Sequence, residues 1–135
     1  MYLLDTDILS NLLRRAPSPD LIARIAAVPP EQQFTSSITL GELVYGARRL
    51  GDRGAGLLER LEDTLLPNLP VLPFDASAAR RYGEARAELE RRGTPTGDAD
   101  LRIASIALAR GLTIVTGNVR HFERVPGLAV ENWLA

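Results

Sequence analysis

Short apolar runs alternate with stretches of helical spacing along the chain. Brief apolar runs bounded by turn residues are typical of buried strands, whereas apolar residues three or four apart are typical of amphipathic helices. The runs predict strands at 2–4, 33–38, 69–73, 112–116 and 128–130. The helical spacing predicts helices at 8–13, 21–26, 39–50, 57–66, 75–92 and 98–110.

Glycines and prolines mark the limits of these elements. Gly111 ends the helix that begins at Asp98, and the glycine-rich segment 51–56 is expected to form a turn. Prolines in the segment 69–73 place that strand at or near a sheet edge. Because strands alternate with helices, we expect an α/β domain with a mainly parallel sheet. The length of 135 residues suits a single domain, 1–135.

The composition narrows the chemistry mainly through the residue types that the chain lacks. It contains no cysteine and no lysine, and its one histidine is His121. Thiolate nucleophiles and zinc sites built from cysteine or several histidines are therefore excluded. Carboxylates, hydroxyls and arginine remain for catalysis. The formal net charge of −1 gives no basic signature of nucleic-acid binding.

The distribution of apolar residues predicts no membrane attachment. No apolar run approaches the roughly 20 residues that a membrane helix needs. The opening segment MYLLDTDILS has no basic leader before its apolar stretch, so it is not typical of a signal peptide. We therefore expect a cytoplasmic protein.

Acidic and polar residues follow the predicted strands. Asp5 ends the first strand, Glu42 lies one turn into the helix after the second, and Asp100 opens the helix before the fourth. Asp98, Thr116 and Asn118 lie near the same places in the sequence. Ligands of open parallel sheets bind beyond the carboxyl ends of the strands, so these side chains are candidates for one shared site.

Helix capping offers a simpler explanation for each carboxylate taken alone. Asp5 is a suitable N-cap, Thr39 and Glu42 fit a capping box, and Asp98 is a suitable start for its helix. Carboxylates that meet at one crevice would repel each other, however, and a hard cation such as Mg²⁺ or Mn²⁺ would relieve that repulsion. The spacing alone leaves capping and metal binding about equally favoured.

Three segments carry a resemblance to a known family. They are LLDTDILS, SSITLGELVYGA and GTPTGDADLRIASIALARGLTIVTGNVRHFERVPGLAVENW, and in this order they cover most of the chain. The sequence resembles the PIN-domain family, and most closely its VapC-like toxins of bacterial and archaeal toxin–antitoxin pairs. The resemblance implies a three-layer α/β/α sandwich and a ribonuclease that depends on Mg²⁺ or Mn²⁺.

The resemblance also implies roles for individual residues. Asp5, Glu42 and Asp100 match the family's catalytic and metal-binding carboxylates. Asn118 matches a fourth position where many relatives have aspartate, and Asp98 is either an auxiliary ligand or a helix cap. Thr6 and Thr116 are expected to orient the carboxylates. Arg48 and Arg49 are candidates for RNA phosphates, although a solvated helix face explains them as well.

The same resemblance implies the binding partners and the product. The substrate would be RNA, cut to leave a 5′-phosphate and a 3′-hydroxyl. A small antitoxin would cover the acidic site, and the toxin itself would form a homodimer. The remaining features have structural interpretations: a packing or turn role for His121, core packing for Trp133 and intrahelical ion pairs for the arginines of the segment 80–92.

Two other classes of protein share parts of this pattern. A haloacid-dehalogenase-type phosphatase would use Asp5 as nucleophile and Asp7 as acid–base. The missing lysine disfavours it, because that family usually uses a lysine beside the aspartate. A non-catalytic PIN-like module would bind RNA or a protein without cleavage. RNA cleavage, hydrolysis of p-nitrophenyl phosphate, and RNA binding alone distinguish the three hypotheses.

Overall fold

A computed structural model describes residues 1–134. Its sheet contains five strands: β1 (Tyr2–Leu4), β2 (Gln33–Ser36), β3 (Val71–Leu72), β4 (Thr113–Val115) and β5 (Val130–Glu131). Their order is β3-β2-β1-β4-β5, and all neighbouring strands are parallel. From β1 the chain adds β2 and β3 on one side and then β4 and β5 on the other, so the topological switch point lies between β1 and β4. The predicted parallel α/β fold is confirmed, with β3 at one edge.

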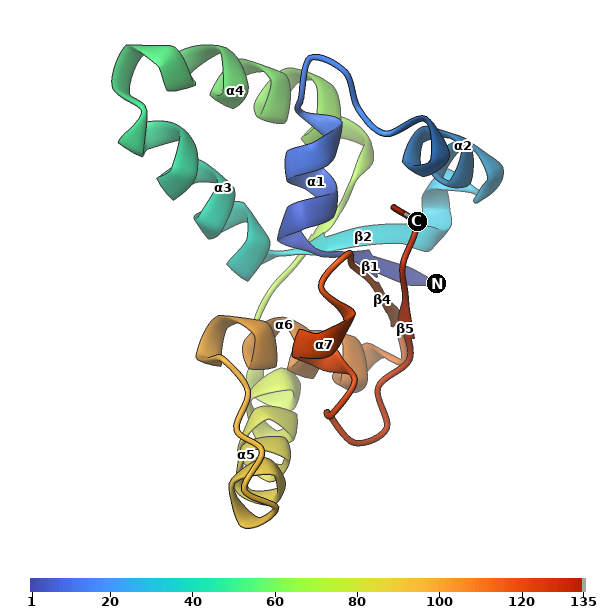
Figure 1. The fold of residues 1–135 in the computed structure, drawn as a ribbon, viewed down its shortest axis with the longest axis vertical. Helices are drawn as coiled ribbons and strands as arrows, with labels where there is room; N and C mark the ends of the chain where they lie inside the picture. Colours follow the sequence, from blue (N-terminus) through green and yellow to red (C-terminus); the bar gives the residue numbers. More distant parts are fainter. Residues whose placement is uncertain (135) are drawn as a thin grey trace.

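Helices cover both faces of the sheet (Figure 1). One face carries α1 (Thr6–Leu12), α2 (Pro19–Ala27), α3 (Ser37–Arg49) and α4 (Ala55–Arg60). The other carries α5 (Ala76–Arg91), α6 (Asp98–Arg110) and α7 (Val119–Phe122). The shorter helical segments are η1 (Pro30–Gln32), η2 (Gly51–Gly54), η3 (Leu61–Leu65) and η4 (Leu66–Asn68). The arrangement is the expected three-layer sandwich.

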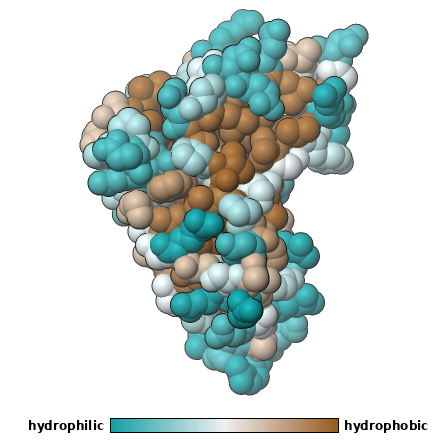
Figure 2. Space-filling view, turned by 180° about the vertical axis from the view of Figure 1, so that it is seen from behind, coloured by the Kyte–Doolittle hydropathy of each residue, from teal (hydrophilic) through white to brown (hydrophobic). Residues whose placement is uncertain are grey.

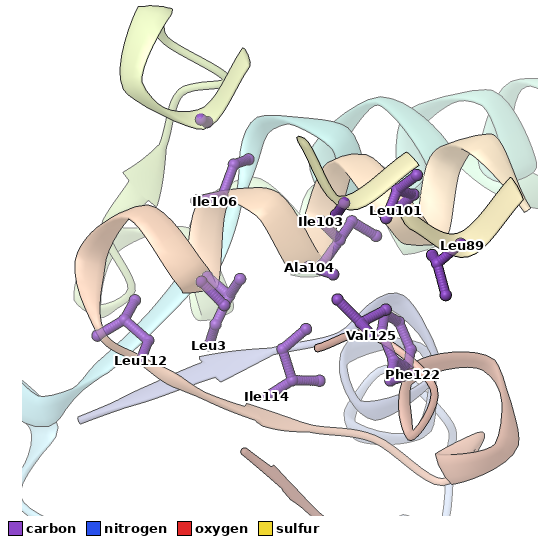
Figure 3. Packing of buried hydrophobic residues seen from close by; sticks show 13 residues of the cluster. Leu3, Leu89, Leu101, Ile103, Ala104, Ile106, Leu112, Ile114, Phe122 and Val125 are labelled. Atoms are coloured by element: carbon purple, nitrogen blue, oxygen red, sulfur yellow. The ribbon is translucent and has the colours of Figure 1, made fainter. Parts of the chain in front are cut away.

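Alternation along the short strands divides the core in two. Leu3 and Ile114 face α6 and pack with Ile103 and Phe122 (Figure 3). Their successors Leu4 and Val115 belong to the other core cluster, with α1, α2 and α3. Successive strand side chains point to opposite faces, so each strand contributes to both cores.

Several boundaries differ from the predicted ones. The strand predicted at 33–38 ends at Ser36, because the Ser36 hydroxyl accepts a hydrogen bond from the Thr39 amide and starts α3 early. The helix predicted at 57–66 begins at Ala55 and continues beyond Arg60 as a π-helical turn and then a 3₁₀ turn. The short helix α7 has no counterpart among the predicted elements. Gly111 ends α6 in the left-handed conformation, as expected.

The carboxyl-terminal strand is fixed by one acidic side chain. The Glu131 carboxylate accepts hydrogen bonds from Arg24 on α2, over 3.2 Å, and from the indole N–H of Trp133, over 3.0 Å. Trp133 is buried and packs edge-on against Tyr2, with ring centres 4.9 Å apart. The expected core role of Trp133 is confirmed.

The surface at the α5 end of the molecule is polar. Viewed from behind, hydrophobic side chains gather around the middle of the molecule, whereas the end formed by α5 is mostly hydrophilic (Figure 2). On α5, Arg86 pairs with Glu90, while Arg91 and Arg92 pair with Glu88. The predicted intrahelical pairing is therefore present. Within residues 1–134, no helix is both long and apolar enough to cross a membrane.

The close approach of η2 to α3 depends on Gly54. A Cβ at this position would lie 1.8 Å from the backbone oxygen of Ala47. We expect Gly54→Ala to lower the free energy of unfolding by about 1–3 kcal/mol, because the backbones must separate. Gly83→Ala is the control: it lies within α5 with open space around it, and should stabilise the protein by up to about 1 kcal/mol. Urea denaturation measures both, and equal stabilities for the two variants would contradict this packing.

Candidate active site

The register of β1 and β4 sets the centre of the site. Leu4 pairs with Val115, and the Asp5 amide donates to the Val115 carbonyl over 3.0 Å. Asp5 and Thr116 therefore leave adjacent strands side by side at the switch point. The Asp5 carbonyl accepts the first hydrogen bonds of α1, but its side chain caps nothing. The capping explanation for this carboxylate is therefore not supported.

Asp5 is a buried carboxylate with few compensating partners. Only 3% of its surface is exposed, and its Oδ2 accepts a hydrogen bond from the Thr116 hydroxyl over 2.9 Å. The pKa of Asp5 is raised to about 7, mainly by burial and to a smaller extent by the charges of Asp7 and Asp100, although hydrogen bonds from the Thr6 backbone and the Thr116 hydroxyl lower it. This carboxylate is therefore a strong candidate for binding a cation.

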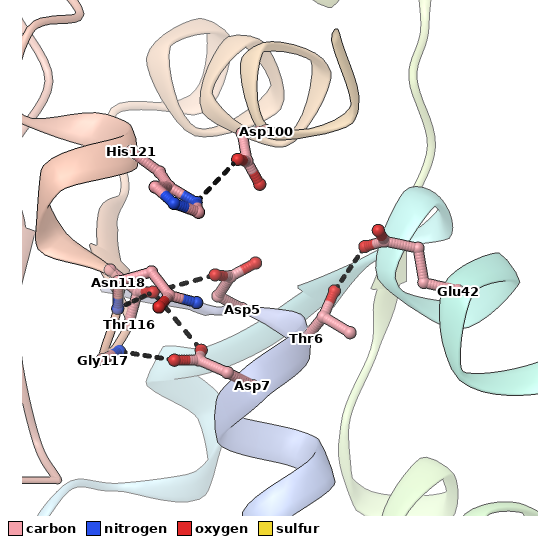
Figure 4. A network of polar contacts seen from close by, with 9 residues as sticks. All are labelled: Asp5, Thr6, Asp7, Glu42, Asp100, Thr116, Gly117, Asn118 and His121. Carbon is pink, nitrogen blue, oxygen red and sulfur yellow. Dashed lines mark hydrogen bonds and ion pairs between the residues drawn. The ribbon is translucent and has the colours of Figure 1, made fainter. Parts of the chain in front are cut away.

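Thr116 connects Asp5 with a second aspartate. The Thr116 hydroxyl lies 3.3 Å from Asp7 Oδ1, and the Gly117 amide donates to Asp7 Oδ2 over 2.7 Å. The same hydroxyl accepts a hydrogen bond from the Asn118 amide over 2.9 Å, and the exposed Asn118 side chain points toward Asp5 and Asp7 (Figure 4). The expected orienting role of Thr116 has a geometric basis. Asp7 belongs to the site, although the sequence indicated it only for a phosphatase.

Asp100 approaches the site from the first turn of α6. Its Oδ2 lies 3.0 Å from Nδ1 of His121, which α7 supplies (Figure 4). Burial raises the pKa of Asp100, while the charge and the hydrogen bond of His121 lower it. The predicted packing role for His121 is wrong, because its ring is largely exposed and contacts Asp100. The alternative turn role agrees with the structure, since the His121 amide donates to the Asn118 carbonyl over 3.0 Å.

Glu42 lies at the margin of the site and binds a hydroxyl. Thr6 donates to Glu42 Oε1 over 2.6 Å, and the Thr6 hydroxyl also lies 3.0 Å from that of Thr39. The capping-box interpretation of Thr39 and Glu42 is wrong, because Ser36 caps α3 instead. Figure 4 places Glu42 on the far side of Thr6 from Asp5.

Asp98 binds residues outside the acidic site. Its carboxylate accepts hydrogen bonds from the Tyr82 hydroxyl and from Arg102 Nε, the latter over 2.9 Å. These contacts lower its pKa. The N-cap of α6 is Gly97, so the predicted cap role of Asp98 is wrong. Its contacts join α6 to α5 on the outside of the domain.

Arg48 and Arg49 lie at the opposite end of α3 from its first turns. Both are exposed in the last turn, about 9 Å along the helix axis from Glu42 at 1.5 Å per residue. The Arg49 guanidinium lies 5.7 Å from the centre of the Tyr45 ring. Their contact with RNA stays a prediction.

The oxygen atoms of the site suit a hard divalent cation. Among residues 1–134, no three acidic or histidine side chains form a compact metal cage. Asp5 and Asp100 nevertheless face the same space, and the charge of Asp100 raises the pKa of Asp5 (Figure 4). Mg²⁺ is commonly held by one or two carboxylates and keeps several waters. The pair Asp5 and Asp100 therefore fits such an ion, and among the described residues Glu42 does not complete a closed set with them.

Comparisons with known proteins place this geometry in a family. The model of the PIN domain matches residues 2–128. The tRNA(fMet)-specific endonuclease VapC of Salmonella typhimurium is 38% identical over 98% of this chain and 97% of its own length. Toxin FitB of Neisseria gonorrhoeae is 34% identical, covering 90% of this chain and 91% of its own. The crystal structure of DNA-bound VapBC from Salmonella typhimurium superposes with a TM-score of 0.89 at 39% identity, over 98% and 97% of the two chains. This chain is thus a member of the PIN-domain family, among relatives of the VapC ribonucleases.

Proposed function

We propose that the protein is a divalent-cation-dependent endoribonuclease and the toxin of a toxin–antitoxin pair. The observation that carries the proposal is the meeting of Asp5 and Asp100 at the switch point of a PIN-domain sheet. The relative from Salmonella typhimurium is named as an endonuclease specific for tRNA(fMet), which supports RNA as the substrate class. The site of action is then the cytoplasm, where such RNA is available.

Asp5 and Asp100 would hold Mg²⁺ or Mn²⁺ through their carboxylate oxygens. When bound, such a cation supplies a water of lowered pKa and positive charge for the phosphate. Thr116 orients Asp5 through its hydroxyl hydrogen bond, and the Gly117 amide keeps Asp7 in place beside it. Asn118 contributes a neutral amide on the same side.

Glu42 would act on the attacking water rather than as a full ligand. Its carboxylate is exposed, and the Thr6 hydroxyl fixes one of its oxygens. The other oxygen remains available to accept a proton or a hydrogen bond from water. Glu42 and Thr6 thus flank the reacting phosphate on one side, and Asp100 and His121 flank it on the other.

An antitoxin and a second copy of the chain are the proposed protein partners. The matching VapBC and FitAB structures are toxin–antitoxin complexes. An arginine of the antitoxin that entered between Asp5 and Asp100 would replace the charge of the cation and inhibit the enzyme. The hydrophobic surface around the middle of the molecule suits protein contacts of this kind (Figure 2).

Metal removal tests the proposal directly. Purified protein is incubated with initiator tRNA and with unrelated structured RNA, in Mg²⁺, in Mn²⁺ and in excess EDTA. We expect new ends with 5′-phosphate and 3′-hydroxyl groups in either cation, and no cleavage in EDTA until the cation is restored. Hydrolysis of p-nitrophenyl phosphate without RNA cleavage would favour a phosphatase. Metal-independent RNA binding without cleavage would favour a binding module.

A further inference from the structure

A second polar pocket adjoins the acidic site on the side of α7. It has a volume of about 400 Å³ and is lined by the loop 95–97, Asp100, Arg120, His121 and Arg124. Asp100 and His121 belong to both the pocket and the acidic site. A ligand that extends from the acidic site past Asp100 would therefore enter this pocket.

Arg120 and Arg124 give the pocket its cationic wall. Both are exposed, and neither forms an ion pair with a carboxylate in the described part of the chain. Other arginines, such as Arg86, Arg102 and Arg110, are paired with aspartate or glutamate. Two guanidinium groups that line the same pocket without carboxylate partners are well suited to an external anion.

The position of these arginines indicates which anion they bind. An acidic side chain in the pocket would be repelled by Asp100 and by the carboxylates of Asp5 and Asp7 just beyond it. A phosphodiester backbone presents one anionic group after another along a chain. It can therefore place one phosphate at the acidic site with its cation and the next among the arginines.

We infer that Arg120 and Arg124 bind the RNA backbone phosphate next to the scissile linkage. This inference rests on the proposed function and names a binding surface for its substrate. The two residues position the strand through its backbone, so they act independently of base identity. They lie beside the acidic site, unlike Arg48 and Arg49 at the far end of α3.

Cleavage of a short single-stranded RNA with one cut site tests the inference. We expect Arg120→Ala and Arg124→Ala each to raise KM about tenfold and leave kcat within a fewfold, since each removes one charged hydrogen-bonding group. The slope of log KM against log salt concentration should fall by about 1 for each arginine. The control Arg80→Ala/Arg81→Ala removes the same charge as the double variant Arg120→Ala/Arg124→Ala from an exposed part of α5.

Substrates with a single neutral methylphosphonate identify the phosphate. Neutralising the linkage next to the cut should weaken RNA binding by the wild type about as much as the arginine substitutions do. The same neutral linkage should weaken RNA binding by the arginine variants little further. Binding measured in the Asp5→Asn background should show the same pattern without chemistry. Wild-type cleavage with KM and salt slope unchanged in both arginine variants would overturn the inference. No cleavage by the wild type would instead overturn the proposed function.

Discussion

Asp5→Asn is expected to abolish RNA cleavage, lowering kcat by about 10³-fold or more, while the protein remains folded. The amide has nearly the shape of the carboxylate, and its oxygen can still accept the Thr116 hydrogen bond. The amide lacks the negative charge that would hold the cation. A cation of this kind lowers the free energy of the transition state by several kcal/mol. Single-turnover cleavage with saturating Mg²⁺ measures the effect, and circular dichroism verifies the fold.

Asp98→Asn is the matched control for this loss. Asp98 opens the same helix as Asp100, but its carboxylate is exposed and binds Tyr82 and Arg102. We expect Asp100→Asn to lose cleavage as Asp5→Asn does, and Asp98→Asn to retain it within a fewfold. If Asp98→Asn were as inactive as Asp100→Asn, the assignment of Asp100 over Asp98 would be wrong.

Without metal, the wild-type protein is expected to lose stability as pH rises from about 4 to about 7. The pKa of Asp5 is raised from 3.8 to about 7 in the folded state. Over this interval Asp5 ionises more readily in the unfolded chain, so the free energy of the unfolded state falls relative to that of the folded state. Each pKa unit corresponds to about 1.4 kcal/mol, so the Asp5 contribution above pH 7 is a loss on the order of 4 kcal/mol.

Urea denaturation in EDTA at pH 5 and pH 8 measures this contribution. Asp5→Asn has no such ionisation, so it should be more stable than the wild type at pH 8 and depend less on pH. Adding Mg²⁺ at pH 8 should stabilise the wild type and leave Asp5→Asn nearly unchanged, because only the wild type retains the buried charge. Parallel pH profiles for the two proteins would show that Asp5 is ionised without cost in the folded state.

The fold follows closely from the pattern of apolar residues. The run Tyr2–Leu4 and the run near Ile114 are strands because each is short, apolar and followed by polar residues. The observed ends of strands and helices differ from the predicted ends where a side chain forms a hydrogen bond that starts another element. The Ser36 cap is the clearest example, because its hydrogen bond to the Thr39 amide turns the end of a predicted strand into the start of a helix.

The sequence predicts which site residues meet at the ends of the strands. It does not predict the contacts between site residues and residues on other helices. Asp5 and Thr116 meet because parallel strands end at the same edge, which the sequence pattern indicates. The partners of Glu42, Asp98 and His121 depend on how α3, α5 and α7 pack, and no local spacing encodes these contacts. The sequence alone does not predict the pairing of Asp98 with Tyr82, because the two residues lie on different helices.

The attachment of β5 has a consequence for the synthesis of the protein. The Thr116 amide donates to the Glu131 carbonyl over 2.9 Å, so the residue that orients Asp5 takes its backbone partner from the last strand. Asp5 leaves the ribosome well before Glu131. A nascent chain that stops before Val130 therefore carries all the acidic residues of the centre without the strand that fixes Thr116. We therefore expect a growing polypeptide to lack an ordered acidic centre until β5 has folded beside β4.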